Sequence, residues 1–301
     1  MNRLDMKYYI AVLAIMVVIC TSCSGGGGIV LPDHDEVSSV YYWKTVFHLD
    51  SADRAFISQH GIGRIYLRMF DVSDNDEALS LKDRTVPNAS VKVGDDAYRL
   101  LCDSLADMEF VPVVYITLEA LKEMSGHEGL LASNIVTRVR NMCEYNGLPN
   151  VRELQLDCDW TSSTESSFFL LCDSVKLCMA ELLLPWRLSS TIRLHQLARP
   201  VPPVHNGVLM VYNTGSFNNP DVCNSIIDVD NVEPYLKYLF SYPLHLDVAY
   251  PTYSWQLLFR NRQFIGLMNG LELSDSTLFR CVDAGKYIVD KNFMYGNRLI
   301  R

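Results

Sequence analysis

The sequence predicts an α/β protein built as a (β/α)8 barrel, and three observations lead to this prediction. Eight short apolar runs rich in β-branched and aromatic residues follow the N-terminal segment. Several of the intervals between them carry apolar residues at helical spacing, and strands that alternate with helices pair in parallel through crossover connections. Polar side chains stand late in most of the runs, where the active sites of such barrels lie. An open doubly wound sheet is the structural alternative.

The predicted elements follow one another along the chain in alternating order. The predicted strands span residues 40–49, 64–72, 110–117, 151–160, 187–195, 207–213, 244–250 and 264–268. The predicted helices span residues 95–108, 130–145, 164–184 and 232–240. In the second helix Leu131, Ile135 and Val139 repeat at four-residue spacing, and Gly147 follows as a stop signal. The sequence contains no G-x-G-x-x-G or P-loop motif, which favours the barrel over a nucleotide-binding open sheet.

The first residues have the pattern of a bacterial lipoprotein signal. Arg3 and Lys7 lie at the start, residues 8–19 are mostly apolar, and small residues precede Cys23 as in a lipoprotein cleavage box. The apolar run is shorter than a typical membrane-spanning helix. The pattern therefore predicts cleavage before Cys23 and lipidation of that residue.

This signal divides the chain into three predicted parts. Residues 1–22 would form the signal peptide, residues 23–36 a flexible tether, and residues 37–301 a single barrel domain. We expect an exported protein of the bacterial cell envelope that contacts a membrane through its lipid anchor only. The formal net charge of -9 argues against a nucleic-acid partner. The oligomeric state stays open.

The fourth predicted strand is the most informative segment, because it carries an amide and two acids on one face. Side chains at i, i+2 and i+4 of a strand point the same way, so Gln155, Asp157 and Asp159 would share a face opposite an apolar one. Acids at the end of a buried strand are costly unless they face water or a ligand. The pattern favours a functional site, and a polar layer paired with Arg193 or Arg68 is the alternative interpretation.

Other predicted strands also place polar or aromatic side chains near their ends. The candidate substrate-binding residues, besides Gln155, are Arg68, Asp71, Arg193, His195, Tyr212, Asn213, Asp247, Tyr250 and Trp255. The strand ends of a barrel meet at one rim, so we expect these residues to surround the two acids. Trp43, Trp160 and Tyr253, like Trp255, have ring faces that suit the C–H faces of sugars, with core packing as the alternative.

Two of these segments resemble motifs of a known enzyme superfamily. The stretch from Gln155 to Trp160 resembles the fourth-strand motif of family-18 chitinases, and Met210-Val-Tyr212-Asn213 resembles their sixth-strand motif. The run 154–159, followed by a helix and then residues 207–215, also resembles an uncharacterised family of bacterial barrel lipoproteins. The resemblance implies a glycan substrate, no cofactor, and hydrolysis in which the acetamido group of the substrate attacks the sugar carbon.

The resemblance also implies roles for individual residues. Asp159 would act as the general acid and Asp157 as the stabiliser that shifts its pKa. Tyr212 and Asn213 would form hydrogen bonds to the acetamido group or to the sugar. Two carboxylates this close repel, which raises one of the two pKa values. The sequence departs from the motif, because Asp159 replaces the catalytic glutamate, Gln155 replaces an acid and Asn213 replaces an aspartate.

Other functional hypotheses stay open at this point. Asp159 could form a conventional carboxylate pair with Asp247, Asp71 or Glu119, and their separation would decide the stereochemical outcome. A non-catalytic glycan-binding surface lipoprotein would use the same cleft without the glutamate. A metal site is not predicted, because the cysteines show no zinc spacing and the acidic residues 71–77 lack the glycine and distal glutamate of an EF-hand loop.

Overall fold

The computed structural model describes residues 36–103, 105–222 and 224–300. The predicted signal peptide, the predicted lipidation site Cys23 and all but the last residue of the predicted tether lie outside these ranges. Each helix within the described ranges is too short or too polar to cross a bilayer. The division of the chain into signal, tether and barrel domain therefore stays a prediction.

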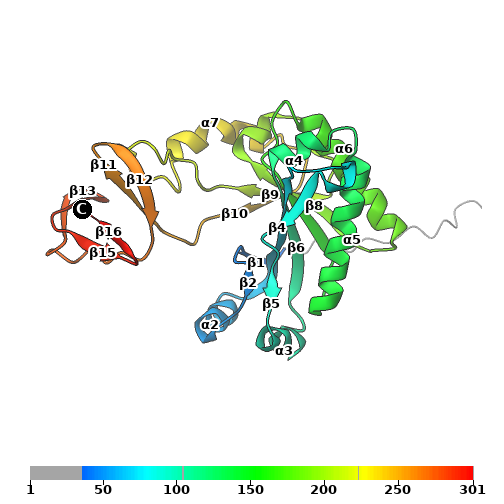
Figure 1. The fold of residues 1–301 in the computed structure, drawn as a ribbon, viewed down its shortest axis with the longest axis horizontal. Helices are drawn as coiled ribbons and strands as arrows, with labels where there is room; N and C mark the ends of the chain where they lie inside the picture. The colour runs from blue at the N-terminus through cyan, green and yellow to red at the C-terminus, as the bar shows by residue number, and fades with distance from the viewer. Residues whose placement is uncertain (1–35, 104, 223, 301) are drawn as a thin grey trace, which may run out of the picture.

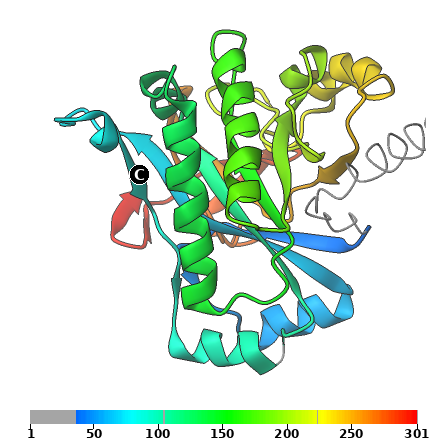
Figure 2. The same cartoon turned by 90° about the vertical axis from the view of Figure 1, so that its right-hand side faces the viewer.

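A curled sheet of parallel strands forms the centre of the fold (Figures 1 and 2). Its parallel strands run in the order β1-β3-β6-β7-β8-β9-β10, and β4 pairs antiparallel with β3. These strands are β1 (Ser38–Tyr42), β3 (Ile62–Asp74), β4 (Thr85–Asn88), β6 (Glu109–Ile116), β7 (Glu153–Asp157), β8 (Arg187–Arg193), β9 (Asn206–Met210) and β10 (Leu246–Ala249). The spatial order of the parallel strands follows the sequence, as it does in a barrel, so the first seven predicted strands are confirmed.

Helices connect most of these strands. They are α2 (Ser51–Gln59), α3 (Asp95–Asp103), α4 (Leu118–Glu123), α5 (Glu128–Asn146), α6 (Glu165–Glu181) and α7 (Val229–Leu239), with short 3-10 helices η2 (Leu81–Asp83) and η3 (Leu194–Ala198). The four predicted helices are confirmed as α3, α5, α6 and α7. Helix α5 ends at Gly147, as predicted, because this residue adopts a left-handed φ of 60° and a Cβ there would lie 2.8 Å from the ring of Tyr98.

The two faces of β7 lie in different environments. Leu154, Leu156 and Cys158 are fully buried in the main hydrophobic core, where α5 and α6 lie side by side against the sheet (Figure 2). Gln155 and Asp157 point to the inner, concave face, where a smaller apolar cluster lies deeper in the sheet. The alternation predicted for this strand is therefore confirmed, and the acids are on the side away from the helices.

The prediction that residues 264–268 form the eighth barrel strand is wrong. Residues 264–268 do form a strand, β12 (Gln263–Met268), but it pairs antiparallel with β11 (Gln256–Arg260) and not with the parallel sheet. The reason is the tight turn between them, in which Asn261 and Arg262 both adopt positive φ, the conformation of a two-residue hairpin turn. Within the described residues the parallel sheet is therefore a seven-stranded half-barrel with β1 and β10 as its outer strands.

Further hairpins follow β12 and make up the C-terminal part of the chain (Figure 1). Strand β13 pairs with β14 and β15 pairs with β16, each pair antiparallel. Besides β11 and β12, the strands outside the central sheet are β2 (Val46–Phe47), β5 (Lys92–Val93), β13 (Phe279–Asp283), β14 (Lys286–Val289), β15 (Phe293–Tyr295) and β16 (Arg298–Ile300). The helix-rich pattern of a barrel thus ends after β10, and antiparallel hairpins replace it.

The core assignment leads to a stability prediction. Leu156→Ala should lower the free energy of unfolding by about 2–5 kcal/mol, because it leaves a cavity in a fully buried site between β7 and the helices. Leu177→Ala, on the exposed side of α6, should change it by less than about 0.5 kcal/mol. Urea unfolding followed by circular dichroism measures both values. Equal effects of the two substitutions would contradict the assigned core.

Candidate active site at the strand ends

Two acids and one arginine meet where β7 and β8 end. Asp157 is the last residue of β7 and only 3% exposed, whereas the side chain of Asp159 is 46% exposed. Arg193, the last residue of β8, places an Nη2 atom 3.1 Å from Asp157 Oδ1 and donates from Nε to Asp159. One guanidinium therefore binds a buried carboxyl group and an open one.

A layer of polar side chains supports this group from below. Thr191 Oγ1 donates a hydrogen bond of 2.6 Å to Asp157 Oδ1. One step lower, Gln155 accepts from Tyr41 Oη at 2.7 Å and donates to Ser189 Oγ at 3.2 Å. Because Gln155 is fully buried and bonded at both ends of its amide, it holds β1, β7 and β8 together beneath the acids.

Burial dominates the electrostatics of the acids. It raises the pKa of Asp157, and the nearby charges of Asp159 and Asp71 raise it further, while Arg193 and the hydrogen bond from Thr191 act in the opposite direction. Burial opposes the charge of Arg193, but the two carboxylates raise its pKa above the usual value. Two acids thus share one cation, which favours a proton on one of them.

Two tyrosines flank the acids. In the register of the sheet Tyr115 of β6 lies beside Asp157, and Tyr212 follows the end of β9. Burial raises the pKa of both phenols, and the charges of Asp157 and Asp159 add to this effect. The sequence reasoning missed Tyr115, although residues at two-residue spacing along β6 share its inner face.

A cavity of about 800 Å³ lies between β1 and β10, the outer strands of the sheet. Tyr41 and Tyr212 line it and also belong to the polar group around the acids, so the cavity adjoins the acid site. On one side the ring of Tyr41 stacks between Trp43 and Tyr66, with ring centroids 5.3 and 4.5 Å apart. Among the described residues no eighth parallel strand occupies this space, so an aromatic hollow lies beside the acids.

Comparison with known proteins agrees with this architecture. No protein-family model and no curated protein matches the chain. Among solved structures, the spore cortex-lytic enzyme SleL of Bacillus cereus matches with a TM-score of 0.50 and 12% identity, over 87% of this chain and 63% of that one. The GH18 chitinase ChiB of Flavobacterium johnsoniae matches with a TM-score of 0.47 and 11% identity, over 77% and 72% of the two chains. A plant beta-glucan endohydrolase matches with a TM-score of 0.37 and 10% identity, over 70% and 75%.

The fold resembles that of the SleL structure. This conclusion rests on the match to SleL, and at 12% identity it concerns the fold alone. The chain spans about 63% of the length of the SleL structure. The barrel-like fold expected from the sequence is therefore confirmed in the form of a curled parallel half-barrel.

Other predicted site residues are divided between the rim and the cavity. Arg68 and Asp71 form an ion pair with each other, and Arg68 also donates to the backbone oxygen of Trp43 at 3.3 Å. Asp247 and Tyr250 line the cavity between β1 and β10. The structure thus places Arg68 and Asp71 on β3, Asp247 on the outer strand β10, and Tyr250 directly after β10.

Two predicted positions differ from the expectation. We expected His195 to follow Arg193 on one strand face, but β8 ends at Arg193 and His195 lies in η3, with Nε2 3.4 Å from the backbone oxygen of Trp160. Trp160 itself is fully buried and packs against Phe168 and Phe169 of α6. The prediction that Trp160 stacks on a sugar is therefore wrong, because the Trp160 ring is buried under α6.

Aromatic residues beyond β9 and β10 form a second group at the rim. Tyr253 Oη donates to Asn213 Oδ1 at 2.9 Å, and the Tyr253 ring lies 5.0 Å from that of Trp255. Trp255 Nε1 donates to Ser225 Oγ at 2.9 Å. Asn213 adopts a left-handed φ of 54°, a conformation that asparagine tolerates better than most residues. These contacts orient Asn213 and Tyr253 next to Tyr212.

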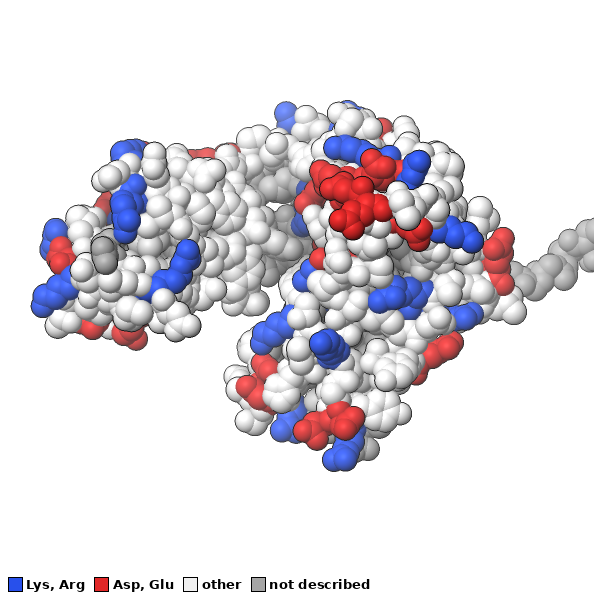
Figure 3. All heavy atoms as spheres, in the orientation of Figure 1, with Lys and Arg blue, Asp and Glu red and all other residues white. Residues whose placement is uncertain are grey.

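Glu119 lies apart from this arrangement. It is exposed in the first turn of α4, a region where acidic side chains gather on the surface in Figure 3. Within the described residues, no group of three or more histidine, cysteine, aspartate or glutamate side chains has the arrangement of a metal site. The chemistry that the strand ends can offer is proton transfer and charge stabilisation by Asp157, Asp159 and Arg193.

The raised pKa of Asp157 predicts a pH dependence of stability. The folded protein binds this proton more tightly than the unfolded chain, so stability from this group falls as the pH rises from about 4 toward the raised pKa. The amide in the Asp157→Asn variant does not titrate, so this position stays neutral across this pH range. Its free energy of unfolding relative to wild type should therefore increase with pH, by at most about 1.4 kcal/mol per pH unit.

Urea unfolding of both proteins between pH 4 and 8 measures this difference. Thr191→Val is a matched variant, because it removes a hydrogen bond that lowers the pKa of Asp157 and should extend the effect to higher pH. A relative stability of Asp157→Asn that falls with pH would show that Arg193 outweighs burial.

Proposed function

We propose that this protein binds a glycan across the ends of β7, β8 and β9 and hydrolyses a glycosidic bond there. The observation that carries the proposal is the group of Asp157, Asp159 and Arg193, which offers one buried acid, one open acid and a single cation. The likeness of the fold to a glycoside hydrolase-like barrel supports it, because the strand ends are the active-site face of such folds.

The exposed acid is proposed as the proton donor. With both acids ionised, the group of three side chains has a net charge of about -1. A bound sugar removes water from Asp159, which makes the second negative charge more costly and favours a proton on one acid. Asp159 is the acid that faces the solvent and hence the ligand, so it would donate that proton to the leaving oxygen. A water molecule would replace the leaving group at the sugar carbon and return a proton to the acid pair. Asp157 would remain the buried partner, and the charge of Asp159 raises its pKa.

The groups around the acids suit a neutral, hydroxyl-rich ligand. Tyr115 and Tyr212 flank the acids with phenol groups, and Tyr253 and Asn213 extend this edge. Trp43 presents a partly exposed ring at the end of β1. Phenols, an amide and an aromatic face are the groups that bind sugar hydroxyls and the C–H faces of pyranose rings.

Asp159→Asn tests the proposed reaction. The amide keeps the shape of the side chain but cannot donate an acidic proton, so turnover on a panel of oligosaccharides should fall by about 10²–10⁴-fold. The dissociation constant of the bound sugar should change by less than about threefold. Asp173→Asn is the control, because Asp173 lies on α6 and pairs with Lys176, outside the site.

Product analysis by chromatography and binding by calorimetry separate the possible outcomes. Wild-type protein that binds an oligosaccharide without cleaving it would overturn hydrolysis and support a glycan-binding protein. Asp159→Asn with wild-type turnover would refute the role of Asp159. A folded protein that neither binds nor cleaves any member of the panel would overturn the proposal as a whole.

We also propose that the protein is a lipoprotein of the bacterial cell envelope, anchored through Cys23. The support is the sequence pattern of the first 23 residues. Cys23→Ala should abolish incorporation of a labelled fatty acid and move the protein out of the membrane fraction, because the anchor is lost. Cys20→Ala is the matched control and should leave both readouts unchanged. Undiminished labelling of Cys23→Ala would contradict the assignment.

A further inference from the structure

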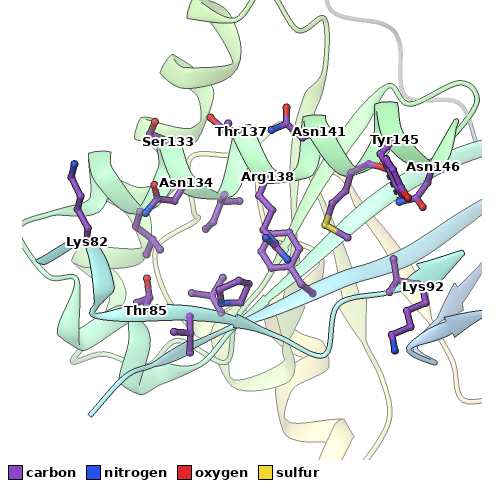
Figure 4. Close-up of a pocket in the computed structure, with 18 of the residues that line it drawn as sticks. Lys82, Thr85, Lys92, Ser133, Asn134, Thr137, Arg138, Asn141, Tyr145 and Asn146 are labelled. Atoms are coloured by element: carbon purple, nitrogen blue, oxygen red, sulfur yellow. Dashed lines mark hydrogen bonds between the residues drawn. The ribbon is translucent and has the colours of Figure 1, made fainter. Parts of the chain in front are cut away.

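A second cavity, of about 980 Å³, lies on the outer side of the sheet beneath α5, bordered by β4 and β5 (Figure 4). None of the strand-end residues proposed for glycan binding lines it. Its volume is at the upper end of the range that small-molecule sites occupy. We call it the α5 groove.

The groove arises from an unusual crossover between β3 and β6. A barrel crossover normally places a long helix along the outer face of the strands. Here the crossover contains β4, β5 and the nine-residue helix α3, which lies at one end of the sheet (Figure 1). The outer face of β3 around Phe70 and Val72 is therefore bordered by α5 and β4 without a helix that fills the space between them.

The charges that line the groove are all positive. Lys82, Lys92 and Arg138 line it, and none of the described lining residues is an aspartate or glutamate. This contrasts with the whole chain, whose formal net charge is -9. In Figure 4 Lys82 and Lys92 lie toward opposite ends and Arg138 points from α5 into the space between them. The groove is thus a local cationic site on an acidic protein.

Arg138 is held in place with a donor to spare. Its guanidinium lies over the ring of Phe70, 5.1 Å from the centroid, and its Nη2 donates to Ser90 Oγ at 3.0 Å. Its Nε is buried and makes no hydrogen bond to any described residue. A guanidinium carries five N–H donors in a fixed plane, so beyond the bond to Ser90 the end of this side chain can still donate to an anionic oxygen of a ligand.

The rest of the lining combines apolar and neutral polar groups. The apolar members are Phe70, Val72, Val86, Pro87, Val91, Val93, Leu131, Ile135 and Met142. Helix α5 adds the polar residues Ser133, Asn134, Thr137 and Asn141 along one edge (Figure 4). An apolar lining with a positioned cation is the arrangement that binds a molecule with an apolar body and an acidic head.

We propose that the α5 groove binds an amphiphilic anion, a single acyl or alkyl chain with a carboxylate, phosphate or sulfate group. The acidic group lies at the guanidinium of Arg138, and the chain lies along the apolar lining from Phe70 to Ile135. Lys82 and Lys92 add long-range attraction from the ends of the groove. This site is separate from the acids at the strand ends and does not depend on the proposed glycan hydrolysis.

Calorimetric titration with octanoate, below its micellar concentration, tests the proposal on the folded protein. Octanoate should bind at one site, and 1-octanol, which has the same chain without the charge, at least about tenfold more weakly. Arg138→Gln should weaken octanoate binding by about tenfold or more and change 1-octanol binding by less than about twofold. Arg140→Gln, on the same helix but outside the groove, should bind octanoate as the wild type does.

A second variant covers the case in which Arg138→Gln unfolds. Thr137→Trp, at an exposed position of α5 that lines the groove, should block octanoate and 1-octanol alike. Vesicles of phosphatidylglycerol distinguish a free amphiphile from a membrane lipid, because retention on vesicles that Arg138→Gln abolishes would assign the site to a lipid headgroup. Equal affinity for octanoate and 1-octanol, no saturable octanoate binding, or an unaffected Arg138→Gln variant would each overturn the proposal.

Discussion

The guanidinium of Arg193 is the interaction on which the candidate site depends. It contacts the buried Asp157 and the open Asp159, which come from the end of the neighbouring strand. Without it, two carboxylates two residues apart would repel in a site where burial already disfavours charge. One cation shared by two acids favours a proton on one of them, and this is the property that the proposed acid catalysis needs.

The position of that group follows from the alternation of side chains along parallel strands. Leu156 of β7 and Cys158, the residue after its end, enter the core beneath α6, while Asp157 points to the opposite face. The free energy of burying the apolar face fixes the register of the strand, since a shift of one residue would bring the acid under the helix. The chemistry of the inner face is therefore supported by the packing of the outer one.

The open sheet gives the inner face more room than a filled barrel has. Because β12 pairs with β11, the space between β1 and β10 holds an aromatic cavity in place of another parallel strand. Tyr41 and Tyr212 belong to both this cavity and the polar group around the acids. On the outer side, the short helix α3 leaves the α5 groove with Arg138. Both hollows lie where the chain departs from a regular alternation of strands and helices.

Local pattern was sufficient to predict the parallel strands, the main helices and the face on which Asp157 lies. Period-two alternation and helical spacing are properties of neighbouring residues, so they can be read without a three-dimensional arrangement. The pairing of Arg193 with both acids was present only as one alternative among several, because a contact between residues 34 positions apart depends on the register of β7 and β8.

Other features were decided by the tertiary structure. Apolar content correctly predicts a strand at residues 264–268. Its antiparallel pairing with β11 depends on the turn in which Asn261 and Arg262 adopt positive φ angles. Trp160 and His195 each follow the end of a strand, where the sequence predicts site residues. In the structure Trp160 packs under α6 and His195 lies in η3. Strand partners, and the direction of a side chain after its strand has ended, depend on contacts between distant segments, which residue spacing does not encode.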